Sequence, residues 1–181
     1  MIEGKKINLR LMEKEDFDFC WDSWNKFNSY GDFEPLGPQL SKSEMEQRLD
    51  VNNPFLKAMN RKRFIIEKKD GTKIGGINHF IVQPHRVMEI GFAINSNERG
   101  KGFGTEAVQI MVDYLFLTNN ISRIQAITDT SNLASKRVLE KSGFTKEGTL
   151  RQYTFTRGKM NDKDIFSIVK TDWKEPKILS R

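Results

Sequence analysis

Past the middle of the chain the sequence reads Arg99-Gly100-Lys101-Gly102-Phe103-Gly104-Thr105-Glu106-Ala107. A strand-like run at residues 88–94 precedes this segment, and a run of helical character follows it from Thr105 to about Thr118. Three glycines within five residues let the backbone turn tightly and leave its N–H groups uncovered. A helix that begins there adds unpaired N–H groups and the positive end of its dipole. The segment therefore predicts a cradle for a phosphate or pyrophosphate group.

Several kinds of site compete for this glycine-rich segment. A nucleotide P-loop needs G-x-x-x-x-G-K-S/T, which is absent because Lys101 precedes Gly102. A dinucleotide fingerprint needs G-x-G-x-x-G in an early strand–helix unit, whereas these glycines are spaced G-x-G-x-G and lie late in the chain. A turn without any ligand is a further alternative. The pattern Q/R-x-x-G-x-G/A between a strand and a long helix is matched at every fixed position by Arg99, Gly102 and Gly104.

That last pattern resembles the pyrophosphate loop of the acetyl-CoA-dependent N-acetyltransferases of the GNAT superfamily. A second segment, which begins Asn132-Leu133-Ala134-Ser135 and ends in Gly143-Phe144, is similar to the family's other cofactor segment. More motifs resemble the RimJ/RimL branch, the ribosomal-protein N-terminal acetyltransferases and their relatives: Ile7–Leu11 with Glu15-Asp16, Glu147-Gly148 with Arg151, Gly158 with Asp162, and Asp172-Trp173. The resemblance covers nearly the whole chain and is weakest between about Asn25 and Asn60.

The resemblance implies one α+β domain over residues 1–181, with a mixed, mostly antiparallel twisted sheet and helices on both faces. Local patterns agree with its element order. They predict strands at 6–11, 64–67, 73–77, 88–94, 121–128, 144–156 and 164–171, and helices at 17–24, 41–52, 54–59, 105–118 and after Asn132. The string Ser41-x-x-Glu44 predicts a capping box, Asp70-Gly71 a hairpin and residues 84–86 a longer turn. The helix after the glycine loop carries one apolar stripe, which consists of Ala107, Val108, Met111, Val112, Leu115 and Phe116. In the family, the parallel strands 88–94 and 122–128 splay apart and the cofactor enters the gap.

Composition narrows the class of partner. The chain has 181 residues, 30 Lys and Arg against 24 Asp and Glu, and a net charge of +6, which suits a polyanionic cofactor. The basic residues are scattered, so we expect no nucleic-acid partner. A single cysteine, Cys20, excludes an internal disulfide, and no apolar leader or membrane-spanning run is found, so we expect a cytoplasmic protein without a membrane partner. The two histidines and this cysteine form no metal-ligand pattern, and we expect no metal.

The resemblance implies acetyl-CoA as co-substrate and assigns residues to bind it. Backbone N–H groups of the loop would hold the pyrophosphate, and Lys101 either adds charge or is a solvated lysine. The pantetheine arm would pair with the strand before the loop, whose N–H groups can also polarise the thioester carbonyl. The implied cofactor residues are Phe92, Ala93, Ile94, Arg99, Gly100, Lys101, Gly102, Phe103, Gly104, Thr105, Asn132 and Ser135.

The acceptor amine must be neutral before it can attack, and a free alkyl ammonium has a pKa of ~8–10. A carboxylate can take its proton, and Glu89, in a Glu-Ile string similar to that of some family members, is our first candidate. The alternative is a structural or solvated strand residue. Glu106 is expected to face solvent or a backbone donor, and Glu147 to orient Arg151.

The leaving thiolate needs a proton. Many family members use a tyrosine four residues before the Gly of Gly-Phe, but this chain has Leu139 there. By resemblance Ser135 is the matching acid, and the alternative is an ordinary serine in the first turn of a helix. With a thiol pKa near ~8.5, an acid can also be dispensable.

These residues imply transfer of acetyl from acetyl-CoA to a primary amine, by direct attack in a ternary complex. The acceptor is either a protein N-terminus or a small amine, and Tyr30, Asp32 and Glu34 fall in the family's variable substrate loop. His79 either reaches the substrate or packs within its strand. Homodimers are common in this branch. A non-catalytic acyl-CoA-binding or sensing module is the alternative function, favoured only by Leu139.

Overall fold

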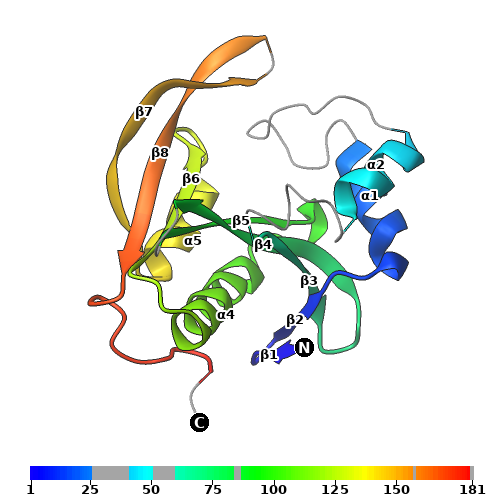
Figure 1. Cartoon of the computed structure of the whole chain (residues 1–181), viewed down its shortest axis with the longest axis horizontal. Helices are drawn as coiled ribbons and strands as arrows, with labels where there is room; N and C mark the ends of the chain where they lie inside the picture. The colour runs from blue at the N-terminus through cyan, green and yellow to red at the C-terminus, as the bar shows by residue number, and fades with distance from the viewer. Residues whose placement is uncertain (26–40, 51–59, 84–86, 157, 180–181) are drawn as a thin grey trace.

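The structure is a computed structural model that describes residues 1–25, 41–50, 60–83, 87–156 and 158–179 (Figure 1). Its strands are β1 (Ile2–Glu3), β2 (Ile7–Leu11), β3 (Lys62–Lys68), β4 (Lys73–Gln83), β5 (Val87–Ile94), β6 (Arg123–Asp129), β7 (Thr145–Thr156) and β8 (Lys159–Val169). Its helices are α1 (Phe17–Asn25), α2 (Lys42–Leu49), α4 (Phe103–Thr118) and α5 (Leu133–Lys141), with 3-10 turns at η1 (Lys14–Asp16) and η3 (Ser96–Glu98).

The strands form one eight-stranded sheet in the order β1-β2-β3-β4-β5-β6-β8-β7. Every neighbouring pair is antiparallel except β5 and β6, which are parallel. Figure 1 shows α4 below the central strands, whereas α1 and α2 lie above them on the right. The mixed, mostly antiparallel sheet with helices on both faces is confirmed.

Local signals place most elements correctly. Asp70-Gly71 turns β3 into β4, with Gly71 at a φ of 83°. The capping box predicted at the start of α2 is present, since the Ser41 hydroxyl accepts from the Glu44 backbone N–H at 3.3 Å and Glu44 Oε2 accepts from the Ser41 N–H at 2.7 Å. The helix expected at 54–59 and the turn expected at 84–86 lie outside the described residues.

Several predicted boundaries were wrong, and the largest difference is in β4, which continues to Gln83 instead of ending near residue 77. Helix α2 ends at Leu49 rather than near residue 52, and α4 begins at Phe103 rather than at Thr105, because Gly102 already serves as its N-cap. Strand β8 begins at Lys159 rather than at residue 164. Residues 159–163 lack apolar alternation and are held extended by pairing with β7, from Thr156 opposite Lys159 onward.

Helix α4 supplies the centre of the core. Its predicted apolar stripe is buried throughout, with at most 4% of any side chain exposed, and consists of Ala107, Val108, Met111, Val112, Leu115 and Phe116. The sheet residues that join this stripe in one hydrophobic cluster include Ile7, Leu9, Ile66, Ile77, Ile90 and Ile124. Packing of α4 therefore fixes which face of β4 and β5 looks into the core and which looks away.

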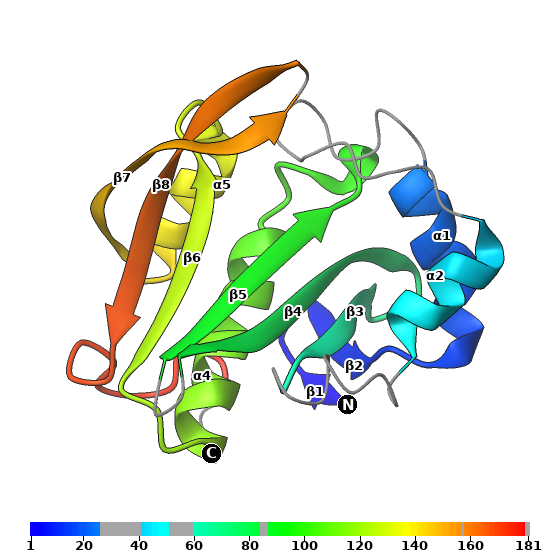
Figure 2. The same cartoon turned by 45° about the horizontal axis from the view of Figure 1, so that its top comes forward.

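The parallel pair separates soon after it begins. Strands β5 and β6 pair only where Val87, Met88 and Glu89 lie opposite Arg123, Ile124 and Gln125. Beyond Glu89, β5 runs on to Ile94 and β6 to Asp129 without further pairing between them. Figure 2 shows the two strands diverging from a shared origin. The splay expected between these strands is confirmed, and it leaves backbone groups of β5 without a strand neighbour on that side.

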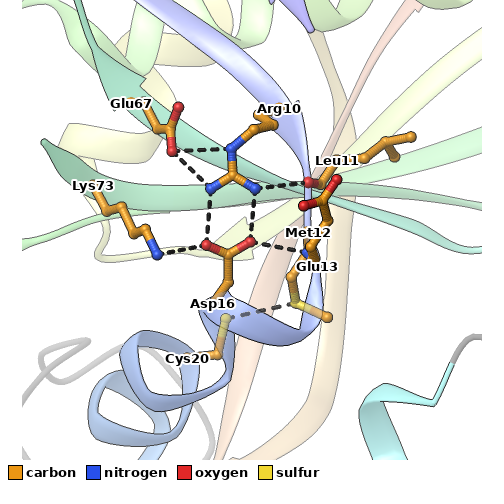
Figure 3. A network of polar contacts seen from close by, with 8 residues as sticks. All are labelled: Arg10, Leu11, Met12, Glu13, Asp16, Cys20, Glu67 and Lys73. Atoms are coloured by element: carbon orange, nitrogen blue, oxygen red, sulfur yellow. Dashed lines mark hydrogen bonds and ion pairs between the residues drawn. The ribbon is translucent and has the colours of Figure 1, made fainter. Parts of the chain in front are cut away.

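A buried carboxylate joins the start of α1 to the sheet (Figure 3). The side chain of Asp16 is fully buried and receives Arg10 Nη2 at 2.8 Å, Arg10 Nη1 at 2.9 Å and Lys73 Nζ at 2.6 Å. Arg10 also reaches Glu67 Oε1 at 2.7 Å, so strands β2, β3 and β4 all contribute. Burial by itself raises the pKa of Asp16, but the hydrogen bonds from Arg10 and Lys73 outweigh it and hold that pKa well below its usual range.

We expect Asp16→Ala to lower the free energy of unfolding by about 2–3 kcal/mol, because it leaves the charged donors of Arg10 and Lys73 without their acceptor. Since the carboxyl has a depressed pKa when folded, its contribution is present at neutral pH and disappears as the pH falls through the acid range. Urea unfolding at pH 7 and in acid measures both effects. The exposed Asp70, in Asp70→Ala, is the control, and an equal loss in the two variants would contradict the prediction.

Candidate functional site

The glycine-rich loop presents backbone donors. Gly100 and Gly102 have φ values of 78° and 87°, in the left-handed region that favours glycine. The first backbone hydrogen bond of α4 runs from the Glu106 N–H to the Gly102 carbonyl at 3.1 Å. The N–H groups of residues 103–105 precede that bond, and the N-cap glycine has no side chain to cover them. The loop therefore has the backbone donors and helix dipole that a pyrophosphate requires.

Cations surround the loop, and several of them have partners within the chain. Arg99 Nε donates to the Ile94 carbonyl at 3.0 Å, so this side chain holds the end of β5. Lys101 Nζ pairs with Glu98 at 2.8 Å rather than being simply solvated. The ammonium of Lys6 lies beside Gly102, 3.8 Å from where a Cβ would stand. The position of Lys6 beside the loop was not predicted from the sequence, because Lys5-Lys6 resembles an ordinary solvated basic pair.

Glu106 explains why Lys6 lies there. Its side chain is buried, and Oε1 accepts from the backbone N–H of Lys6 at 2.7 Å and of Ile7 at 3.3 Å. The expectation that Glu106 faces solvent is wrong, whereas a backbone donor is indeed its partner. It binds the start of β2 to the first turn of α4, which is a structural task.

Glu89 stands at the point where β5 and β6 part. It is the last residue of β5 that pairs with β6, opposite Gln125, and Gln125 Nε2 donates to Glu89 Oε2 at 2.9 Å. Burial raises the pKa of Glu89 above its usual value, while the Gln125 hydrogen bond and the Arg61 charge act in the opposite direction. A carboxylate with a raised pKa is a stronger base than an exposed glutamate, so the group is suited to accept a proton.

Helix α5 lies beside the glycine loop and carries two of the expected cofactor residues at its N-terminal end. The Asn132 side chain is the N-cap of α5 and accepts from the Ser135 N–H at 3.0 Å. The Ser135 hydroxyl is half-buried and forms no hydrogen bond within the described part of the chain. Val138 Cγ2 lies 3.6 Å from where a Cβ on Gly104 would stand, so α5 flanks the loop. Leu139 is fully buried in the core and offers no acid.

The role expected for Glu147 was wrong. Glu147 forms a bidentate ion pair with Arg123 and accepts a hydrogen bond from the Ser167 hydroxyl at 2.6 Å. It does not orient Arg151, which is exposed. The hydrogen bonds from Arg123 and Ser167 lower the pKa of Glu147 to about 2, so it is a poor base.

His79 does not reach the face that carries Glu89. Its ring is buried on the α4 side, 6.1 Å from the Phe64 ring and 6.5 Å from the Tyr114 ring between centroids. Burial lowers its pKa to about 4, which keeps the imidazole neutral at physiological pH. The expected substrate-loop residues Tyr30, Asp32 and Glu34 lie outside the described residues.

The residues that surround Glu89 were not predicted from the sequence. Phe80 of β4 lies directly opposite Glu89, and the Arg61 guanidinium carbon lies 5.3 Å from the centre of the Phe80 ring. Asn78 lies opposite Gly91, and its Nδ2 donates to the Gly91 carbonyl at 3.3 Å. Strand alternation predicts which residues share a face within one strand, but only the register brings these side chains together.

Two further findings concern ligands and membranes. Within the ranges that the structure describes, no three His, Cys, Asp or Glu side chains gather in an arrangement that could hold a metal ion. Among the same residues, none of the helices has the length and apolar character needed to cross a bilayer.

Comparison with known proteins agrees with this geometry. A family model described as an acetyltransferase (GNAT) domain matches residues 6–145. The uncharacterized N-acetyltransferase YoaA of Bacillus subtilis (strain 168) is 40% identical over 177 residues, covering 94% of this chain and 97% of YoaA.

Two solved structures share the fold. Spermidine N-acetyltransferase from Vibrio cholerae, in complex with CoA and spermine, superposes with a TM-score of 0.82 at 24% identity, over 94% of this chain and 99% of that one. Ribosomal-protein-S5-alanine acetyltransferase from Vibrio fischeri superposes with a TM-score of 0.81 at 25% identity, over 96% and 98% of the two chains. The chain has the glycine loop and the diverging parallel strands, and the family model matches most of its length, so it belongs to the GNAT family of acetyltransferases.

Proposed function

We propose that this acetyl-CoA-dependent N-acetyltransferase acts by direct attack of a primary amine in a ternary complex, with Glu89 as general base. The observation that carries the proposal is the position of Glu89. Glu89 has a partly buried carboxylate and is the last residue of β5 that pairs with β6. The unpaired part of β5 that leads to the glycine loop begins directly after it. Base and loop thus lie on one strand–loop–helix unit, and the acetyl donor must lie between them.

Acetyl-CoA supplies an activated acetyl thioester, and residues of this chain fit its anionic end. The backbone N–H groups of Gly100 to Thr105 are suited to hold a pyrophosphate, and Lys6 and Lys101 add positive charge nearby. Between Phe92 and Ile94, β5 has no β6 neighbour, so its backbone is open to the amides of an extended pantetheine arm. Helix α5, which begins at the Asn132 cap and carries Ser135, approaches the loop through Val138.

The protons can be followed through named groups. Glu89 accepts a proton from the acceptor ammonium, and the neutral nitrogen then forms its bond to the acetyl carbon while the carbon–sulfur bond breaks. The sulfur leaves as thiolate. The attacking nitrogen gives up its second proton, which reaches the thiolate through the Ser135 hydroxyl or through water, and Glu89 releases its own proton to solvent. The low exposure of Glu89 and its single amide neighbour Gln125 favour proton acceptance, because no cation forms a hydrogen bond with it among the described residues.

The acceptor is either a protein N-terminus or a small amine. The two structural neighbours represent these two acceptor classes, since one is named for spermidine and the other for the alanine of a ribosomal protein. The test is a thiol-release assay with acetyl-CoA against N-terminal Ser, Ala and Met peptides, polyamines, aminoglycosides and amino acids. Turnover of at least one amine supports the proposal.

A non-catalytic acyl-CoA-binding module is the second candidate, since buried Leu139 replaces the tyrosine acid of many relatives. Calorimetry with acetyl-CoA separates the two functions. Binding without turnover of any amine would favour the module, and absence of binding would overturn both candidates. The homodimer expected for this branch stays a prediction, which sedimentation can check.

We expect Ser135→Ala to lower kcat by no more than about 10-fold, because a thiol with a pKa near ~8.5 leaves readily as thiolate. The backbone N–H of residue 135 keeps its bond to Asn132, so the start of α5 is preserved. Steady-state kinetics at pH 7 to 9 measures the effect, which should shrink as the pH rises. A loss of 100-fold or more across this range would instead make Ser135 the essential acid.

A further inference from the structure

One row of side chains crosses four neighbouring segments on the face of the sheet opposite α4. Phe80 lies opposite Glu89 and Glu89 opposite Gln125, and residues that face each other across paired strands share a face. His79, next to Phe80 in sequence, packs against Tyr114 of α4, so Phe80 points the other way. Arg61 lies over the Phe80 ring and ends the row. We call these four residues the Glu89 row.

Arg61 is a half-buried cation with an unused donor. Its Nε is buried, and no described residue accepts a hydrogen bond from it. The guanidinium lies over the Phe80 ring, and the charge of Glu89 acts on it from further away. A buried guanidinium donor without an acceptor is costly, so the site favours the arrival of an anion.

A second arginine increases the positive charge on this face. Arg63 lies two residues further along β3, opposite Asn78, and strand alternation places it on the same face as Arg61. Burial, together with the nearby charge of Arg61, lowers the pKa of Arg63 to about 10. The charge of Arg61 acts on Glu89, and Arg63 lies on the same face, so this face disfavours a polycationic ligand and favours a ligand that carries negative charge.

Resting on the function proposed above, we propose that the acceptor is an amine that also carries a carboxylate, and that Arg61 binds this carboxylate while Glu89 receives the amine proton. Two strand spacings of about 4.8 Å separate the backbones of Arg61 and Glu89, so a ligand of amino-acid or dipeptide size can reach both side chains. The shared chemistry has two sources, a free amino acid or an acidic residue near the N-terminus of a peptide.

The experiment uses matched acceptors in the thiol-release assay. Free amino acids are compared with their amides, Ser-Glu peptides with Ser-Gln peptides, and spermidine serves as the polycation. With the wild-type protein we expect kcat/KM to be about 10- to 100-fold higher for the carboxylate-bearing member of at least one pair, since hydrogen bonds between charged groups are worth about 1.5–3 kcal/mol. The pair that responds identifies the source.

Arg61→Gln should abolish that preference through a higher KM, while the neutral member of the pair keeps its kcat within about two-fold. Arg61→Lys should retain part of the preference, because the positive charge remains but the bidentate hydrogen bonding to a carboxylate is lost. Lys62→Gln is the matched control: it removes one charge at the next, exposed residue, which pairs with His79 and not with the Glu89 row. Thermal melting checks that all three variants are folded.

Equal kcat/KM for both members of every pair, or a preference for spermidine that Arg61→Gln leaves intact, would overturn the proposal while leaving the acetyltransferase function in place. A preference that survives Arg61→Gln would also overturn it, since the carboxylate would then be bound elsewhere. Absence of turnover with every amine would instead defeat the proposed function, and this proposal with it.

Discussion

Glu89→Gln should lower kcat for the preferred amine by about 100-fold or more, which is the usual contribution of a positioned general base. Glutamine keeps the shape of the side chain and can still accept from Gln125, so the change removes proton acceptance and little else. The measurement is steady-state thiol release, with acetyl-CoA binding followed separately by calorimetry. We expect the dissociation constant for acetyl-CoA to stay within about two-fold.

The pH profile distinguishes a base from a structural carboxylate. Burial raises the pKa of Glu89, so kcat/KM of the wild-type protein should fall as the pH drops through that raised pKa, and this limb should be absent in Glu89→Gln. The sign for stability is the reverse of the usual case for an acid. A carboxyl with a raised pKa when folded costs stability as the pH rises, so Glu89→Gln should leave the Tm at pH 8 unchanged or higher.

Glu140→Gln is the control for this prediction, because Glu140 is an exposed carboxylate on α5 and should have no effect. Full activity of Glu89→Gln would show that another group, or water, takes the proton. A lower Tm together with lost activity would assign Glu89 to the structure rather than to the reaction.

Gly102→Val should weaken acetyl-CoA binding by about 10-fold or more. Gly102 has a φ of 87°, which costs an L-residue about 1–2 kcal/mol and is worst for a β-branched side chain. The loop would relax away from this conformation, and the N–H groups before Glu106 would no longer converge on one anion. Calorimetry with CoA and acetyl-CoA measures the change, and saturating acetyl-CoA should restore much of kcat.

Gly71→Val provides the matched control. Gly71 has a φ of 83° in the β3–β4 hairpin, and a Cβ there would meet no neighbouring atom within 4 Å, so it carries similar backbone strain away from the loop. Both variants should lose stability, but only Gly102→Val should lose affinity. Equal affinities in the two variants would mean that the loop conformation is not needed for binding acetyl-CoA.

Part of the fold could be predicted because its signals are local. The Asp70-Gly71 hairpin, the capping box at Ser41 and the stripe on α4 each depend on residues within a few positions of one another. The early end of α2, the start of α4 at Phe103 and the polar beginning of β8 were missed. Cap choice and pairing with a partner strand override the apolar pattern at such boundaries.

The candidate site divides in the same way. Its glycine loop, the Asn132 cap and the place of Glu89 in the strand before the loop follow from contiguous segments of sequence. The partner of Glu147, the core position of His79, and Lys6 beside the loop did not follow. Each depends on a contact between residues that are far apart in the chain.

By itself, the sequence determined the element order, the family and the conformation of the glycine-rich loop, because turns, caps and apolar periods are set by near neighbours. Only the tertiary structure decided what surrounds Glu89. Strand register placed Phe80, Arg61 and Gln125 around it, and the divergence of β5 from β6 opened the space beside it. A shift of one residue in either pairing would turn these side chains to the opposite face, and no local pattern specifies that choice.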